Sequence, residues 1–154
     1  MKKKWFVVLG VLAVSLVLSA GCCGATQSAS GAESEPDPYS LNYGKTAVAE
    51  NMHITLENID GGNIDEDGLR DYSVQFTVRN DGKEKDSVPG AFYLVDSQNR
   101  YFEANYFTCG FLVNPGVQKT DTCKFFDVPA TAEIKSIVLW DEITDYQITL
   151  FELE

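Results

Sequence analysis

From about residue 44 to the end of the chain, apolar and polar residues alternate in short runs separated by Gly, Pro, Asn or Asp. The runs are rich in Val, Ile, Thr, Tyr and Phe. Alternation with a period of two is typical of strands, and no stretch shows the period of an amphipathic helix. The pattern predicts strands at 45–49, 52–59, 71–80, 90–96, 100–108, 117–127, 134–140 and 145–153.

Seven or eight strands at intervals of about ten residues predict an all-β, immunoglobulin-like two-sheet β-sandwich over residues 44–154. The alternation also predicts which side chains are buried. Tyr72, Val74, Phe76 and Val78 share one face of their strand, which we expect to point inward. Residues 137–140 are apolar on both faces, as expected for a central strand.

The N-terminus has the organisation of an export signal. Three lysines follow Met1, an apolar run extends from Trp5 to Leu18, and three small residues precede Cys22. The run is shorter than the about 20 residues that span a membrane. We therefore expect residues 1–21 to be a signal peptide.

The small residues that end in Cys22 resemble the lipobox of exported lipoproteins, in which the cysteine is acylated, as with palmitate, and becomes the mature N-terminus. The alternatives are an ordinary secretory cleavage site or acylation of Cys23, whose preceding residues fit less well. Two or three acyl chains give a stable anchor. The resemblance predicts a protein attached to the extracytoplasmic face of the cell membrane.

Residues 22–43 consist mainly of Ala, Ser, Gly, Thr, Glu and Pro. Such a segment buries too little apolar surface to offset the entropy of ordering, which predicts a disordered tether behind the lipid anchor.

Charge excludes some partners. The chain carries a net charge of −11, and without the three N-terminal lysines nine basic residues face 23 acidic ones, a net charge of −14. Nucleic acid is therefore not an expected partner, because its binding depends on Lys and Arg at phosphates. Anionic lipid headgroups are also repelled, so the lipid anchor must attach the protein to the membrane.

Cys109 and Cys123 lie within the predicted domain. Disulfides persist in exported proteins, and a bridge here would close a loop of about 15 residues. A disulfide is the expected state; two reduced core thiols or a metal site are the alternatives.

Several motifs occur in a characteristic order: Val78-Arg79-Asn80-Asp81-Gly82, then Leu94-Val95-Asp96 with Arg100, then Asn114-Pro115-Gly116, and finally Phe125-Phe126-Asp127-Val128-Pro129. In this order they resemble the telokin-like, immunoglobulin-like domain of uncharacterised exported lipoproteins, which is related in fold to a secreted immunoprotective antigen. The likeness covers about residues 43–154. It implies a β-sandwich on a lipid tether with no assigned activity. Asn99 stands where that hairpin usually has glycine, and the Cys109–Cys123 pair is not general to the family.

Residues 63–71 contain the clearest candidate metal site. Asn63, Asp65 and Asp67 alternate before Gly68, as in the first half of a calcium loop, and Asp71 could add an oxygen ligand. The bidentate Glu of such a loop would fall at position 74, which is Val74. A solvated acidic loop is therefore the main expectation, and a calcium site is the alternative.

The remaining candidates for chemistry are few. His53 is the single histidine, so no site that needs two histidines can form, and we expect it on the polar face of its strand. Asp141, Glu142 and Asp145 could act as general acids and bases, but they flank a predicted turn and are expected to be surface charges.

Aromatic residues are concentrated between positions 101 and 126. In the pairs Tyr101-Phe102 and Tyr106-Phe107, a strand would place one ring in the core and the other outside. We expect sheets or loops to cover the outer rings; the alternative is an exposed aromatic patch, which would mark an interaction site.

These observations predict a non-enzymatic binding module with an unidentified protein or glycan partner and no cofactor, with calcium as the alternative. The alternatives are a calcium-stabilised structural protein of the envelope and, last, a hydrolase.

Overall fold

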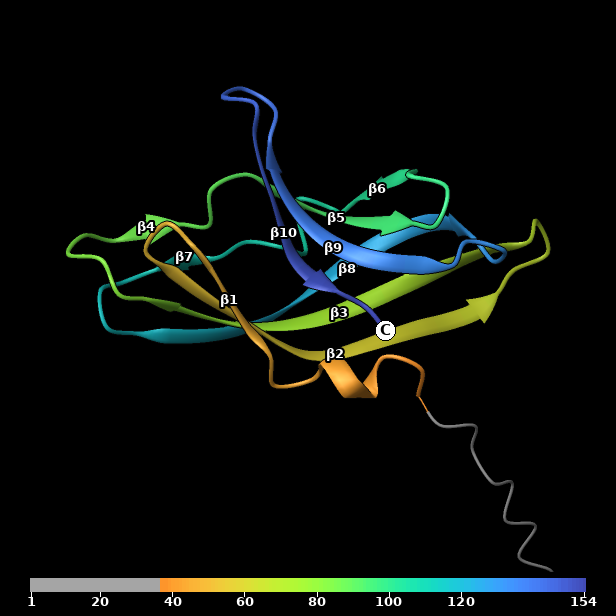
Figure 1. Cartoon of the computed structure of the whole chain (residues 1–154), viewed down its shortest axis with the longest axis horizontal. Coiled ribbons are helices and arrows are strands. Elements are labelled where there is room, and N and C mark those ends of the chain that lie inside the picture. The colour runs from red at the N-terminus through yellow and green to blue at the C-terminus, as the bar shows by residue number, and fades with distance from the viewer. Residues whose placement is uncertain (1–36) are drawn as a thin grey trace, which may run out of the picture. The chain divides into compact units, whose positions relative to one another are not determined.

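A computed structural model of the chain describes residues 37–154, which are all-β (Figure 1). The predicted signal peptide, Cys22 and the tether up to residue 36 lie outside the described residues. The elements are the 3₁₀ helix η1 (Ser40–Asn42) and the strands β1 (Thr46–Ala49), β2 (Met52–Ile64), β3 (Leu69–Asn80), β4 (Asp86–Ser87), β5 (Ala91–Asp96), β6 (Tyr101–Glu103), β7 (Leu112–Val113), β8 (Gln118–Pro129), β9 (Ile134–Asp141) and β10 (Tyr146–Glu152).

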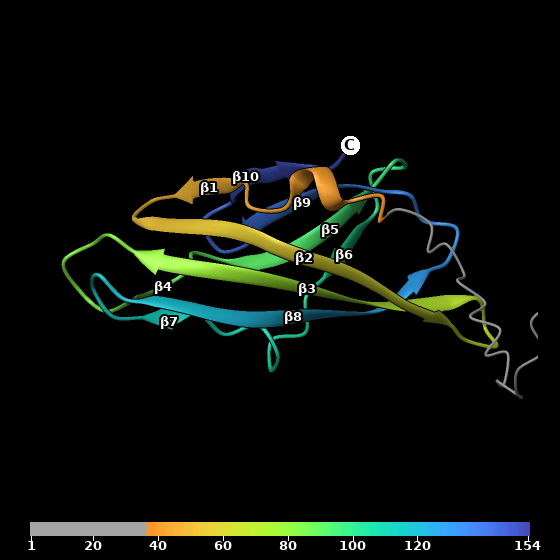
Figure 2. The ribbon, with the colours of Figure 1, turned by 90° about the horizontal axis from the view of Figure 1, so that it is seen from below.

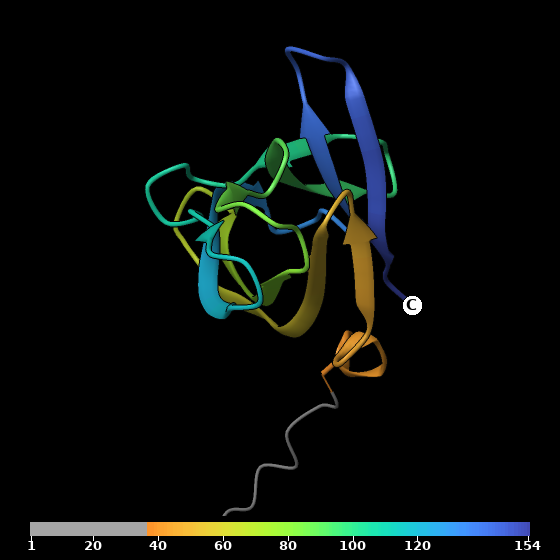
Figure 3. The same cartoon turned by 90° about the vertical axis from the view of Figure 1, so that its left-hand side faces the viewer.

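The strands form two four-stranded antiparallel sheets and one short ribbon. The first sheet has the order β1-β2-β3-β8, in which β2, β3 and β8 run side by side in Figure 2. The second sheet has the order β10-β9-β5-β6, and β4 pairs with β7. Figure 3 shows β1 next to β10, so the two sheets approach each other along this edge.

Each of the eight predicted strands has a counterpart, but some of the predicted lengths were wrong. The strand expected at 100–108 ends at Glu103, because the chain then leaves β5 and crosses to β8. The hairpin of β2 and β3 is longer than expected and extends to Ile64 and Leu69. Two strands of only two residues, β4 and β7, were not predicted, since alternation needs a longer run to be visible.

The predicted inward faces are confirmed. Tyr72, Val74, Phe76 and Val78 are all buried, and residues 137–139 of β9 are buried on both faces. Buried residues from both sheets belong to one continuous hydrophobic cluster. The two sheets therefore share a single core, as the alternation of apolar residues requires.

Phe76 lies at the centre of this core and connects the sheets. Its ring on β3 stacks on Phe92 of β5, with centroids 4.6 Å apart, and on Phe151 of β10 at 6.4 Å. Phe111, just before β7, meets Phe76 edge-on at 6.5 Å. Aromatic pairs in these geometries add to the stabilisation from burial alone.

The first described residues, 37–43, were assigned to the tether from the sequence. In the structure they contain η1, and Tyr39 and Tyr43 pack against the core. The Tyr43 hydroxyl accepts a hydrogen bond from the Ile59 backbone N–H at 3.1 Å. Burial of the phenol and its hydrogen bond with the Asp37 carboxylate together raise the pKa of Tyr43 to about 12.

Asn80, at the end of β3, joins the β3–β4 loop to β7. Its side chain is fully buried, and its amide donates to the carbonyl oxygens of Glu84 and Val113 at 2.8 and 2.9 Å. Its side-chain oxygen accepts from the Gly82 N–H at 2.7 Å. Both N–H donors and the oxygen acceptor of the Asn80 side chain thus have partners, which explains why an amide can be buried at this position.

Asp96 organises the β5–β6 hairpin. One carboxylate oxygen accepts the backbone N–H groups of Gln98 and Arg100, and the other accepts the Arg100 guanidinium at 2.6–2.7 Å. Burial by itself would raise the pKa of Asp96, but these hydrogen bonds and the Arg100 charge outweigh it and hold the pKa below its ordinary value. Asn99 has a φ of 58°, a left-handed conformation that Asn tolerates.

We predict that Asp96→Asn lowers the free energy of unfolding by about 2 kcal/mol at pH 7, because the buried network loses its negative charge and one of its two acceptor oxygens. A lowered native pKa stabilises the fold above the ordinary Asp pKa of 3.8, and this contribution is lost as the pH falls through the native value. The difference between wild type and variant should therefore shrink below about pH 4. Urea unfolding from pH 7 to pH 2.5 measures it, with the exposed Asp67→Asn as control. An equal difference at both ends of the range would contradict this account.

Candidate binding site: a disulfide-anchored aromatic loop

Residues 104–111, between β6 and β7, form a loop that exposes two aromatic rings. We call this segment the aromatic loop. Tyr106 and Phe107 are 84% and 93% exposed, and their ring centroids are 5.8 Å apart in an edge-on arrangement. The prediction that one of these rings would be buried was wrong, because the segment is a turn and not a strand. Two large aromatic rings in water at one place are unusual for a surface without a binding role.

Asn105 fixes the turn that carries both rings. Its side-chain oxygen accepts from the Phe107 backbone N–H at 3.0 Å, and its carbonyl oxygen accepts from the Thr108 N–H at 3.0 Å. Asn is favoured in turns for this reason. The rings are therefore presented on an ordered backbone.

Hydrogen bonds attach the aromatic loop to both sheets. The Ala104 N–H donates to Phe92 O on β5 at 2.8 Å, and the Asn105 N–H donates to Lys124 O on β8 at 2.7 Å. The Lys124 N–H in turn donates to the Thr108 hydroxyl oxygen at 3.1 Å. β8 is an edge strand of the first sheet and β6 is an edge strand of the second. The aromatic loop therefore connects the two sheets along this pair of edges.

The predicted disulfide is confirmed and lies in this loop. Cys109 is bonded to Cys123 of β8, with Cα atoms 4.4 Å apart. Cys123 is fully buried in the core, and Cys109 is half-buried. The bridge therefore fixes the C-terminal side of the aromatic loop to β8, the edge strand of the first sheet.

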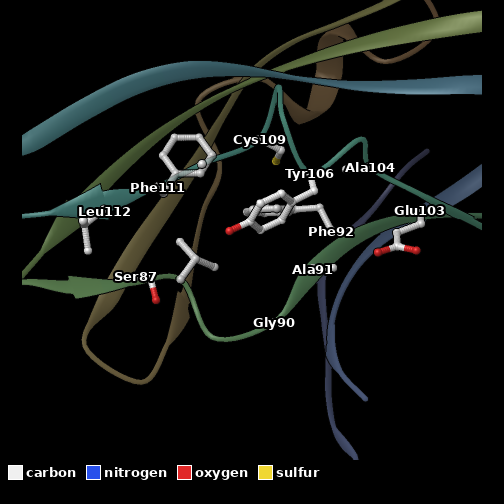
Figure 4. Close-up of a pocket in the computed structure, with 12 residues that line it drawn as sticks. Ser87, Gly90, Ala91, Phe92, Glu103, Ala104, Tyr106, Cys109, Phe111 and Leu112 are labelled. Carbon is white, nitrogen blue, oxygen red and sulfur yellow. The ribbon is translucent and has the colours of Figure 1, made fainter. Parts of the chain in front are cut away.

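A cavity of about 420 Å³ lies beside the aromatic loop (Figure 4). Its walls are mainly apolar, and Glu103 is the one charged residue among those that line it. Phe92 and Phe111 are buried in the wall, whereas Tyr106 and Leu112 are exposed at the rim. Ligand sites are commonly concave and apolar and have volumes of roughly 300–1,000 Å³.

Gly90, which lies between β4 and β5, shapes the wall of the cavity. Its φ is +94°, and a Cβ atom would lie 2.6 Å from the Trp140 carbonyl group. Only glycine allows this approach, which brings the segment against β9.

The calcium candidates do not converge in the structure. Asp65 and Asp67 lie in the turn between β2 and β3, where one Asp65 oxygen accepts the backbone N–H groups of Asp67 and Leu69 at 3.0 and 2.8 Å. Asn63 lies on β2, and Asp71 on β3 accepts from the Asp127 N–H at 3.3 Å. Within residues 37–154, no three His, Cys, Asp or Glu side chains form a group suited to a metal. Calcium binding stays a prediction.

His53 is half-buried on the outer face of the first sheet. Its Nε2 lies 3.0 Å from the Asp81 carboxylate, which also binds Arg79. The pKa of Asp81 is lowered, first by side-chain hydrogen bonds from Arg79 and then by electrostatic interactions with Arg79 and His53.

Asp141, Glu142 and Asp145 flank the turn between β9 and β10, as predicted. The Asp141 carboxylate caps this turn by accepting from the Thr144 hydroxyl and the Ile143 N–H, and these bonds lower the pKa of Asp141. Asp141 therefore serves the turn, whereas Glu142 accepts a hydrogen bond from the Tyr93 hydroxyl at 3.1 Å.

A second aromatic cluster covers the outer face of the second sheet. The rings of Tyr93, Tyr101 and Trp140 have centroids 5.6–6.2 Å apart. Burial first, and the hydrogen bond to Glu142 next, raise the pKa of Tyr93 to about 12. As predicted for the first aromatic pair, Tyr101 is exposed and Phe102 packs against the core.

Comparison with protein-family models, with curated proteins and with solved structures finds no match to this chain. Of the helices in the described part, none is long and apolar enough to cross a membrane.

We predict that the double variant Cys109→Ala/Cys123→Ala lowers the free energy of unfolding by about 3 kcal/mol, because the unfolded chain regains the entropy of a loop of about 15 residues. Thermal unfolding with and without dithiothreitol checks it. Reductant should lower the Tm of the wild type toward that of the variant and leave the variant unchanged. A wild-type Tm that does not respond to complete reduction would contradict the prediction.

Proposed function

We propose that this protein is an exported lipoprotein that presents a non-catalytic β domain as a binding module, and that the aromatic loop is its contact surface. The anchor is proposed at Cys22, on the cell membrane and facing away from the cytoplasm. Support for the anchor comes from the charged, apolar and small-residue segments that precede Cys22.

We also propose that the domain is an immunoglobulin-like β-sandwich of the telokin-like kind. Two four-stranded antiparallel sheets with a shared core support this assignment. The Asp96–Arg100 pairing within the β5–β6 hairpin supports it further, since these two residues belong to the motif that carries the resemblance.

One observation carries the binding function: Tyr106 and Phe107 are almost fully exposed on a turn that is fixed to both sheets. Aromatic side chains dominate the affinity of many interfaces, since each buries a large area. A rigid loop loses little entropy when it binds, which preserves that affinity. The walls of the adjacent cavity are apolar, with a single carboxylate residue, so they suit binding better than acid–base chemistry.

The proposed anchor predicts that Cys22→Ser abolishes incorporation of an alkyne-labelled fatty acid and releases the protein from the membrane fraction, because the acyl chains provide the attachment. Cys23→Ser is the matched control and should keep both label and membrane association. Equal labelling of the Cys22→Ser variant and the wild type would contradict the anchor.

The proposed contact surface predicts that p-benzoylphenylalanine in place of Phe107 forms a discrete photo-adduct on intact cells. Ile143 is the matched control, since it is 96% exposed in the β9–β10 turn. The same probe at position 143 should give no such adduct, and Tyr106→Ala should weaken the adduct at 107 several-fold. The absence of an adduct at 107, or the same adducts at both positions, would contradict the proposal.

A further inference from the structure

We infer that the cavity beside the aromatic loop accepts one bulky apolar side chain of a polypeptide whose neighbouring residues are basic. The inference rests on the proposed function and specifies the chemistry of the partner.

The walls of the cavity require an uncharged, apolar occupant. Val88, Phe92, Ala104 and Phe111 supply buried apolar surface, and no Lys or Arg lines the cavity to balance a buried anion. A volume of about 420 Å³ is ample for one aromatic or branched aliphatic side chain.

The apolar surface continues beyond the cavity, which favours a polypeptide over a small molecule. Tyr106 lines the cavity and also contacts the ring of Phe107, which does not line it. Leu112, at 56% exposure, extends the rim on the side of β7 (Figure 4). An occupant that covers Leu112 and Phe107 as well as the cavity must extend beyond the cavity, as a chain segment with an anchor residue does.

Charge complementarity favours basic residues beside the anchor. Residues 37–154 contain nine basic and 21 acidic residues. Lys119, whose ammonium lies over the Phe111 ring, is paired with Asp121 at 2.9 Å. The excess of acidic residues gives the domain a negative electrostatic potential, which repels an acidic partner and attracts a basic one.

The test uses the full chain in vesicles of zwitterionic phosphatidylcholine and three fluorescein-labelled heptapeptides. The first has one tryptophan between two pairs of lysines, the second has alanine in place of tryptophan, and the third has glutamates in place of lysines. Fluorescence anisotropy measures binding. The first peptide should bind saturably, and the other two at least tenfold more weakly.

Variants locate the binding site. Gly110 lines the cavity, and a Cβ atom there would meet no other atom within 4 Å, so Gly110→Trp is chosen to place a large ring at the cavity. This variant should weaken binding of the first peptide at least tenfold with an unchanged Tm. The double variant Tyr106→Ala/Phe107→Ala should weaken it at least fivefold, and Ile143→Ala should not change it.

Three results would overturn the inference: equal binding of the three peptides, no binding of any of them, or full binding by Gly110→Trp with an unchanged Tm. If any of these results is found but the photo-adduct at position 107 still forms, the aromatic loop is a contact surface and only the inferred chemistry of the partner fails. If the adduct is also absent, the proposed function fails as well.

Discussion

The fold depends on the burial of two apolar sheet faces against each other, and Phe76 is where the two faces meet. Its ring touches Phe92 and Phe151 of the opposite sheet, while Phe111 closes the group from the side of β7. Burial of aromatic surface supplies most of the driving force for such packing, and stacking adds to it. Strands that alternate in polarity can satisfy this constraint only as two layers with a common core.

The two edges of this pair of sheets are closed in different ways. At one edge β1 lies next to β10, whereas at the other the aromatic loop connects β5 to β8. An exposed strand edge offers unpaired backbone groups to other chains, and covering it with a loop is a common solution. Here the covering loop is also bonded through Cys109 to Cys123, so the structure that protects the edge holds two aromatic rings in the solvent.

This arrangement separates stability from recognition. The disulfide, the Asn105 turn and the hydrogen bonds to β5 and β8 fix the backbone, so the side chains of Tyr106 and Phe107 are not needed for packing. Substitutions at the two rings can therefore change what the loop binds at little cost in stability. The net negative charge of the described residues acts at longer range, where it influences which partners approach and at what rate.

The sequence by itself determined the all-β class, the approximate positions of eight strands, the buried face of β3 and the Cys109–Cys123 pairing. These features follow from the period of two along a strand and from the small number of cysteines. Only the tertiary structure decided that residues 104–111 leave the strand, that both rings of Tyr106 and Phe107 are exposed, and that Asp65 serves a turn. It also decided that Phe92 on β5 and Phe111 just before β7, which belong to different segments of the chain, line one cavity. A local pattern reports the face of an element, whereas a cavity forms between elements, and its shape depends on contacts that no single stretch of sequence contains.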